Sequence, residues 1–178
     1  AVGGGAIAIM TSANASADDA IAFGRATDSD GVGSISIGGR SANGARVNSG
    51  AGDGAIAIGG GSGLTGSVGA ACVAAEAIAI GTTASVSSGE GAIALGARTS
   101  VIGQGGIAIG GDGVASGTGA AAVAAGAIAI GGRDGTNPSA SSGQLNSIAI
   151  GSGSIAGVQK SINAVSYTHL RAHETVLD

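Results

Sequence analysis

The sequence predicts an all-β protein, a parallel β-solenoid in which each coil of the chain contributes two short strands. Three observations support this fold class. A unit that reads Ala-Ile-Ala-Ile-Gly or a close variant occurs nine times, its large aliphatic residues alternate strictly with small ones, and its copies return at a near-fixed interval. Between the first aliphatic residues of successive copies the steps are 14, 14, 21, 22, 15, 14, 21 and 20 residues. A fixed period of this kind is typical of a stacked array.

The alternation has a period of two, which indicates a strand and not a helix. The large side chains of each copy then point to one face of the strand, and Ala or Ser points to the other. We expect the large side chains to fill the interior of each coil. These expected core residues are Ile7, Ile9, Ile21, Phe23, Ile35, Ile37, Ile56, Ile58, Ile78, Ile80, Ile93, Leu95, Ile107, Ile109, Ile128, Ile130, Ile148 and Ile150.

A glycine closes eight of the nine copies, and glycine adopts a positive φ at no steric cost. We therefore expect a turn after each copy. The expected turn glycines are Gly24, Gly38, Gly59, Gly81, Gly96, Gly110, Gly131 and Gly151. A weaker apolar stretch between copies, such as 84–86 or 100–102, provides the second strand of the coil.

The small-residue face of the repeat predicts association between chains. With one Phe, one Tyr and no Trp, the chain has few large side chains for a globular core. Burying an Ile contributes about 2 kcal/mol, whereas ordering a residue costs about 1.5 kcal/mol, and the 38 glycines raise that cost. A solitary stack is therefore marginal, and we expect neighbouring chains to pack through their Ala and Ser faces.

The longer steps contain insertions rich in Gly and Ser. In solenoids, insertions form loops on one side of the rod, which is often the binding side. The last insertion also holds the only proline, Pro138, which suits a loop better than a central strand. The candidate binding loops are residues 39–54, 59–69, 110–119 and 132–143.

The last fourteen residues, 165–178, lack the repeat and contain both histidines, His169 and His173. A nucleotide sequence that encodes most of this segment resembles a transposon end and adaptor used for short-read sequencing libraries. We therefore interpret residues 1–164 as one repeat domain, a fragment open at both ends, and residues 165–178 as a non-native tail. Neither histidine then supports a catalytic or metal site.

Composition argues against several kinds of partner. The net charge is −4, and there is no basic run or aromatic platform, which disfavours nucleic acid. The longest apolar stretch, 69–81, is interrupted by Glu76 and is too short to span a membrane, so no membrane contact is expected from this segment.

No enzyme, cofactor or metal site is predicted. The single cysteine, Cys72, occupies the position that Ala122 occupies fifty residues later, which favours a buried structural role. The segment 28–31, Asp-Ser-Asp-Gly, lacks the further oxygen ligands of a calcium loop and is read as turn chemistry. No nucleophile–base pair remains.

The repeats resemble the head domain of trimeric autotransporter adhesins, the YadA-like family. The head repeat of that family runs roughly Ser/Ala-x-Ala-Ile-Gly followed by small residues and Gly, which residues 77–89 and 147–151 match. The resemblance extends over about residues 5–164. It implies a left-handed parallel β-roll, a homotrimer about a common axis, and display at the cell surface on the outer membrane of a Gram-negative bacterium.

Family heads attach cells to host matrix, host cells or one another. The resemblance therefore implies a non-catalytic adhesin whose partners are further copies of the chain and an extracellular-matrix or host-cell ligand of unknown identity. Two alternatives remain. A phage tail fibre or virion spike also suits a trimeric β-solenoid, whereas an ice-binding solenoid needs a regular Thr array that 82–83 and a few scattered Thr do not provide.

Overall fold

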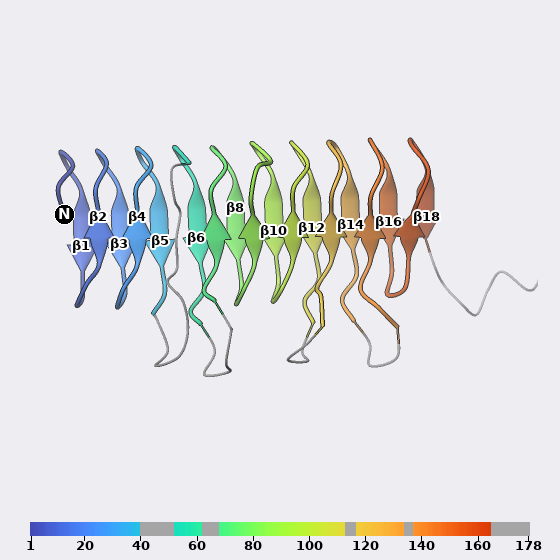
Figure 1. Cartoon of the computed structure of the whole chain (residues 1–178), viewed down its shortest axis with the longest axis horizontal. Helices are drawn as coiled ribbons and strands as arrows, with labels where there is room; N and C mark the ends of the chain where they lie inside the picture. Colours follow the sequence, from blue (N-terminus) through green and yellow to red (C-terminus); the bar gives the residue numbers. More distant parts are fainter. Residues whose placement is uncertain (40–51, 62–67, 113–116, 134–136, 165–178) are drawn as a thin grey trace, which may run out of the picture.

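The chain forms a rod of stacked coils. The structure is a computed structural model that describes residues 1–39, 52–61, 68–112, 117–133 and 137–164. The secondary-structure elements of these residues are all β-strands. Strands β1 and β18 lie at opposite ends of the rod (Figure 1). The predicted all-β, parallel solenoid architecture is thus confirmed. The proposed tail, 165–178, lies outside the described residues.

The larger sheet has ten parallel strands and contains all nine predicted copies of the repeat, one strand from each coil. A tenth strand comes from an Ile-Asn-Ala segment that the repeat count missed. The strands are β1 (Ile7–Ile9), β3 (Ile21–Phe23), β5 (Ile35–Ile37), β6 (Ile56–Ile58), β8 (Ile78–Ile80), β10 (Ile93–Leu95), β12 (Ile107–Ile109), β14 (Ile128–Ile130), β16 (Ile148–Ile150) and β18 (Ile162–Ala164).

The opposite side of the rod is formed by short segments between the copies of the repeat. Two parallel sheets of six and two strands lie there. Their strands are β2 (Asn14–Ala15), β4 (Asp28–Ser29), β7 (Ala71–Cys72), β9 (Ser85–Val86), β11 (Ser100–Val101), β13 (Ala121–Ala122), β15 (Ser141–Ser142) and β17 (Ile155–Ala156). Strand β15 lies within the segment 132–143 that was predicted as a loop, so that prediction is wrong at 141–142.

The insertions leave the stacking of the coils unchanged. Ile35 pairs with Ile56 in register although 21 residues separate them. In a coil without insertion, the amide of Ala84 donates to the carbonyl of Gly81 at 3.2 Å. After an insertion, the chain returns to form the equivalent hydrogen bond with its own turn glycine: the amide of Ala120 donates to the carbonyl of Gly110 at 2.8 Å. The insertion therefore does not displace a strand. Of the four predicted loops, residues 40–51, 62–67, 113–116 and 134–136 lie outside the described residues.

The interior of the coils is filled by small side chains, which reverses the predicted orientation of the repeat. The middle residue of most strands in the ten-stranded sheet, Ala or Ser, is fully buried. The largest fully buried side chains of the described residues are Val86 and Val101. A Cβ added to Gly106, the residue before β12, would lie 2.8 Å from Cγ1 of Val101, so this Val faces a residue without a side chain. The space between the sheets is thus too narrow for Ile.

The large residues of the repeat point outward instead, and none of the eighteen predicted core residues is buried. Seven are exposed, namely Ile7, Ile9, Phe23, Ile37, Leu95, Ile130 and Ile150. The others are half-buried by their neighbours on the same face, namely Ile21, Ile35, Ile56, Ile58, Ile78, Ile80, Ile93, Ile107, Ile109, Ile128 and Ile148.

The turn glycines are confirmed. All eight predicted positions have a positive φ, from 106° at Gly151 to 150° at Gly38. Six of them also lie against the backbone of the next coil; a Cβ added to Gly131, for example, would come within 2.7 Å of the carbonyl carbon of Gly151. Glycine is therefore required there both for its conformation and for close stacking.

The inward direction of the Ala column can be tested by enlarging one member. Replacing Ala94 by Ile should destabilise the protein by about 1–3 kcal/mol, because an overpacked interior must displace its neighbours. Replacing Ser100 by Ile, on the outward face of β11, should change the free energy of unfolding by less than about 0.5 kcal/mol. Urea unfolding of both variants measures the difference, and equal tolerance at the two positions would contradict the burial described here.

The turn glycines allow a second test of the fold. Gly131→Ala should destabilise the protein by more than about 1 kcal/mol, because its φ of 147° is unfavourable for Ala and the added methyl meets the next coil. Gly143→Ala is the matched control, since a Cβ there meets nothing within 4 Å. The control should be neutral or slightly stabilising in thermal unfolding. A similar loss in both variants would count against the proposed stacking role.

Candidate functional site

The most extensive feature of the surface is an apolar face on the ten-stranded sheet, which we call the Ile face. It consists of the two outward residues of each strand, which form two columns along the rod. The first column is Ile at every strand: Ile7, Ile21, Ile35, Ile56, Ile78, Ile93, Ile107, Ile128, Ile148 and Ile162. The second column is Ile9, Phe23, Ile37, Ile58, Ile80, Leu95, Ile109, Ile130, Ile150 and Ala164.

The Ile face is large enough to indicate an interaction surface. Ten strands about 4.8 Å apart, each about 10 Å long, cover an area of about 450 Å². The largest apolar patch of a typical soluble monomer is about 300–600 Å² and is often functional. Neither column contains a charged residue. The Ile face is therefore suited to contact with another apolar surface.

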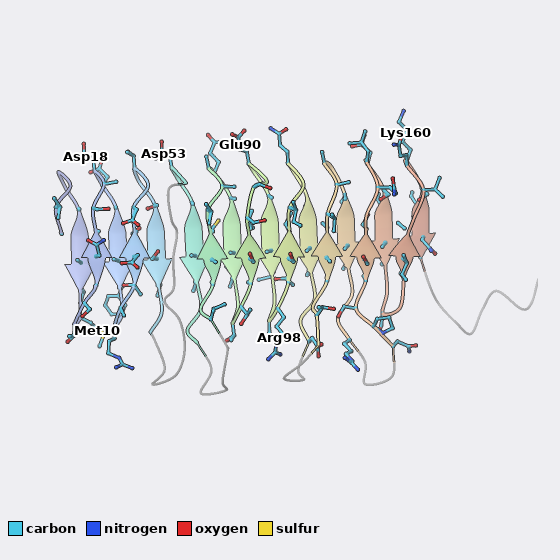
Figure 2. All side chains as sticks on the ribbon, viewed as in Figure 1. Met10, Asp18, Asp53, Glu90, Arg98 and Lys160 are labelled. Carbon is cyan, nitrogen blue, oxygen red and sulfur yellow. The ribbon has the colours of Figure 1, made fainter. Side chains whose placement is uncertain are left out.

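Most charged side chains of the described residues lie along the edges of the rod, at the turns, with Asp28 of β4 as an exception. Figure 2 shows Asp18, Asp53 and Glu90 at the turns of one edge and Arg98 at the opposite edge. This distribution keeps charge away from the Ile face. A docking partner could reach the face without desolvating an ionised group in its centre.

The outward face of the six-stranded sheet differs from the Ile face. The first outward residue of each strand is small in all but the last strand: Ala71, Ser85, Ser100, Ala121, Ser141 and, in the last, Ile155. Larger aliphatic residues follow the strands only at intervals, as with Val73, Ile102 and Val123, which are 45–47% exposed. This side offers no continuous apolar column, so the two faces of the rod are chemically distinct.

A hollow of about 310 Å³ lies at one margin of the Ile face. Met10, Phe23 and Ile37 line it, together with Gly38 and Arg25. Met10 and Phe23 are 62% and 46% exposed. The hollow therefore combines an apolar wall from three neighbouring coils with a guanidinium-bearing residue.

A ladder of charges connects three successive turns on the loop-bearing edge. Arg98, Asp112 and Arg133 each lie two residues after a turn glycine. The Asp112 side chain is buried, its Oδ2 lies 3.8 Å from Nη1 of Arg133, and Nη1 of Arg98 donates to the Asp112 carbonyl at 3.2 Å. Sequence reasoning missed this ladder, although the alternating charges at one repeat position were a usable signal.

Asp30, from the segment 28–31 weighed as a calcium loop, and Asp53 instead form hydrogen bonds between successive coils. Asp30 Oδ1 accepts hydrogen bonds from Ser16 Oγ at 2.6 Å and from Asn14 Nδ2 at 3.3 Å, both from the preceding coil. Asp53 accepts one from the amide of Val32 at 2.9 Å. Within the part of the chain that the structure describes, no three or more His, Cys, Asp or Glu residues form a group that could hold a metal ion. The same residues contain no helix that could cross a membrane.

Cys72 is buried in β7, as its correspondence with Ala122 predicted. Desolvation by burial raises the pKa of the Cys72 thiol to about 11, and a hydrogen bond with the backbone of Ile56 lowers it in part. The thiol is therefore protonated at neutral pH and is a poor nucleophile. The geometry supports a structural role.

Comparison with models of known protein families finds no match for this chain. Comparison with curated proteins finds no significantly similar sequence.

The raised thiol pKa predicts a pH dependence of stability. The folded state keeps the Cys72 proton up to a pH of about 11, whereas an unfolded thiol loses it near pH 8.5. The contribution of this group is fully present below about pH 8.5 and is lost as the pH rises toward the folded value. Urea unfolding at pH 7 and pH 10 should show a loss of stability that is smaller in Cys72→Ala. An identical loss in both proteins would contradict the buried thiol.

Proposed function

We propose that this chain is a non-catalytic adhesive rod, the head of a trimeric adhesin, in which three β-rolls pack about a common axis through their Ile faces. The observation that carries the proposal is the continuous, charge-free Ile face over ten strands. The repeat resemblance described above supports the same assembly. In this proposal the Ile columns, and not the Ala column expected from the sequence, form the contact between chains.

A further copy of the chain suits the Ile face better than an unrelated partner. The face repeats at about 4.8 Å, and a partner that packs along all of it needs the same spacing. A parallel second copy has that spacing by construction. Most homo-oligomers have closed symmetry, and three chains about an axis would leave no Ile face uncovered. A left-handed coil, which the resemblance implies, is part of the proposal.

The loops and the outward face of the six-stranded sheet would remain accessible in such a trimer. We propose that they contact an extracellular-matrix or host-cell ligand, or another bacterium, from the outer-membrane surface. The insertions do not displace strands, so loop sequence could vary while the rod is kept. Three copies of a weak site would raise the overall avidity.

The structure gives little support to an ice-binding surface. The hydroxyls of Thr27 and Thr99 are turned inward and donate to the carbonyls of Gly24 and Gly96. No Thr occupies an outward position of the described strands. A regular outward Thr array is the feature that this function would need.

Oligomeric state tests the assembly. Sedimentation equilibrium should give a trimer for the parent chain. The double variant Ile93→Asp, Ile107→Asp should be monomeric, because burying unpaired carboxylates costs several kcal/mol per chain. The double variant Ser85→Asp, Ser100→Asp places the same charges on the opposite sheet and should remain trimeric. A parent chain that is monomeric at all concentrations would contradict the proposal.

Adhesion is tested on the same proteins. The parent trimer should bind to one or more members of a panel of immobilised extracellular-matrix proteins or to cultured cells. The monomeric Ile-face variant should bind much more weakly, since avidity is lost. Trimeric protein that binds none of these surfaces would argue against an adhesin and would favour a fibre or spike.

A further inference from the structure

The Ile face creates a problem of axial register between chains. Its first column is Ile at all ten strands, and its second column departs from Ile only at Phe23, Leu95 and Ala164. The insertions do not interrupt the Ile face and so provide no landmark for register, because Ile35 and Ile56 remain directly paired across one of them. If one chain slips by one strand, about 4.8 Å, nearly every contact exchanges Ile for Ile. A repetitive face therefore specifies register poorly.

Phe23 is the largest departure from this uniformity. It is the only Phe in the chain, and its side chain is 46% exposed in the second column of the Ile face. It also borders the hollow of about 310 Å³ that Met10 and Ile37 line from the coils on either side. The face thus carries one exposed aromatic ring and one adjacent hollow at the same height along the rod.

We propose that Phe23 sets the axial register of the trimer, with the Phe23 ring of each chain entering the hollow of the next. This inference rests on the proposed function, since it presumes assembly through the Ile face. In a parallel trimer with coils at equal height, each ring meets a neighbour's hollow, and the contact closes around the axis. A slip of one strand would present Ile9 or Ile37 to the hollow in place of the ring.

The chemistry of the hollow suits an aromatic ring. Met10 lines it, and the thioether sulfur of Met makes favourable contacts with aromatic rings. Gly38 contributes no side chain, which leaves space for an inserted group. Buried aromatic anchors in pockets are the groups that most often dominate binding energy at interfaces. A second copy of the chain, in equal register, presents its own Phe23 ring at the height of the hollow.

Disulfide trapping can detect a slip. Two differently tagged chains, Ile93→Cys and Ile107→Cys, are co-expressed in a Cys72→Ala background, trimers that contain both tags are purified, and the trimers are oxidised. Positions 93 and 107 lie on adjacent strands. Links between identical positions report equal register, and links from 93 to 107 increase when chains are offset by one strand. The measured quantity is the ratio of 93–107 links to links between identical positions.

The ratio should rise about tenfold when Phe23 is replaced by Ile, which corresponds to about 1.4 kcal/mol of lost discrimination. Phe23→Leu should move the ratio in the same direction. Leu95→Ile is the matched control, since Leu95 lies in the same column, is similarly exposed and does not line the hollow. The control should leave the ratio unchanged.

The outcomes separate the two proposals. A trimeric Phe23→Ile protein with an unchanged ratio would overturn the register role and leave the trimer intact. An equal rise in the Leu95→Ile control would also overturn it, because any change in the column would then loosen the register. A parent chain without a trimer would overturn the proposed function and the register role together.

Discussion

The narrow space between the sheets is the constraint on which the rest of this rod depends. The interior of the coils is filled mostly by methyl and hydroxyl groups, and its largest fully buried side chains are Val86 and Val101. Where Val101 enters, the opposite position is Gly106, and where Ser29 and Ser34 face each other, their hydroxyls bond at 2.7 Å. Because Ile does not fit, every Ile of the repeat is directed to the surface.

An interior of alanines buries little apolar area per residue, so it contributes less to folding than an Ile-filled core would. The large apolar side chains, whose burial could stabilise the rod, lie instead on the Ile face. A covered Ile face would therefore couple folding to association, and the stability of the coils would depend on protomer concentration. This reasoning links the narrow interior to the oligomer that we propose.

The turns separate the part of the molecule that must be constant from the part that can vary. The turn glycines lie so close to the next coil that a Cβ at Gly131 would meet backbone. The insertions begin at such glycines and close on their carbonyls, as the bond from Ala140 to Gly131 at 2.9 Å shows. Loops of different length can therefore be carried on one edge while strand register and the Ile face are preserved.

The alternation and spacing of the repeat were sufficient to predict the strands, the parallel stacking and the turn glycines, because these depend on local geometry that recurs in each copy. The tenth strand was missed because Asn163 and Ala164 break the pattern, and the charge ladder through Asp112 was missed because its members are 14 and 21 residues apart. Which face of the strand points inward could not be read from the alternation, since Ala and Ile are both apolar. The tertiary structure decided it through the distance between the sheets, which admits the methyl of Ala94 and leaves Ile93 outside.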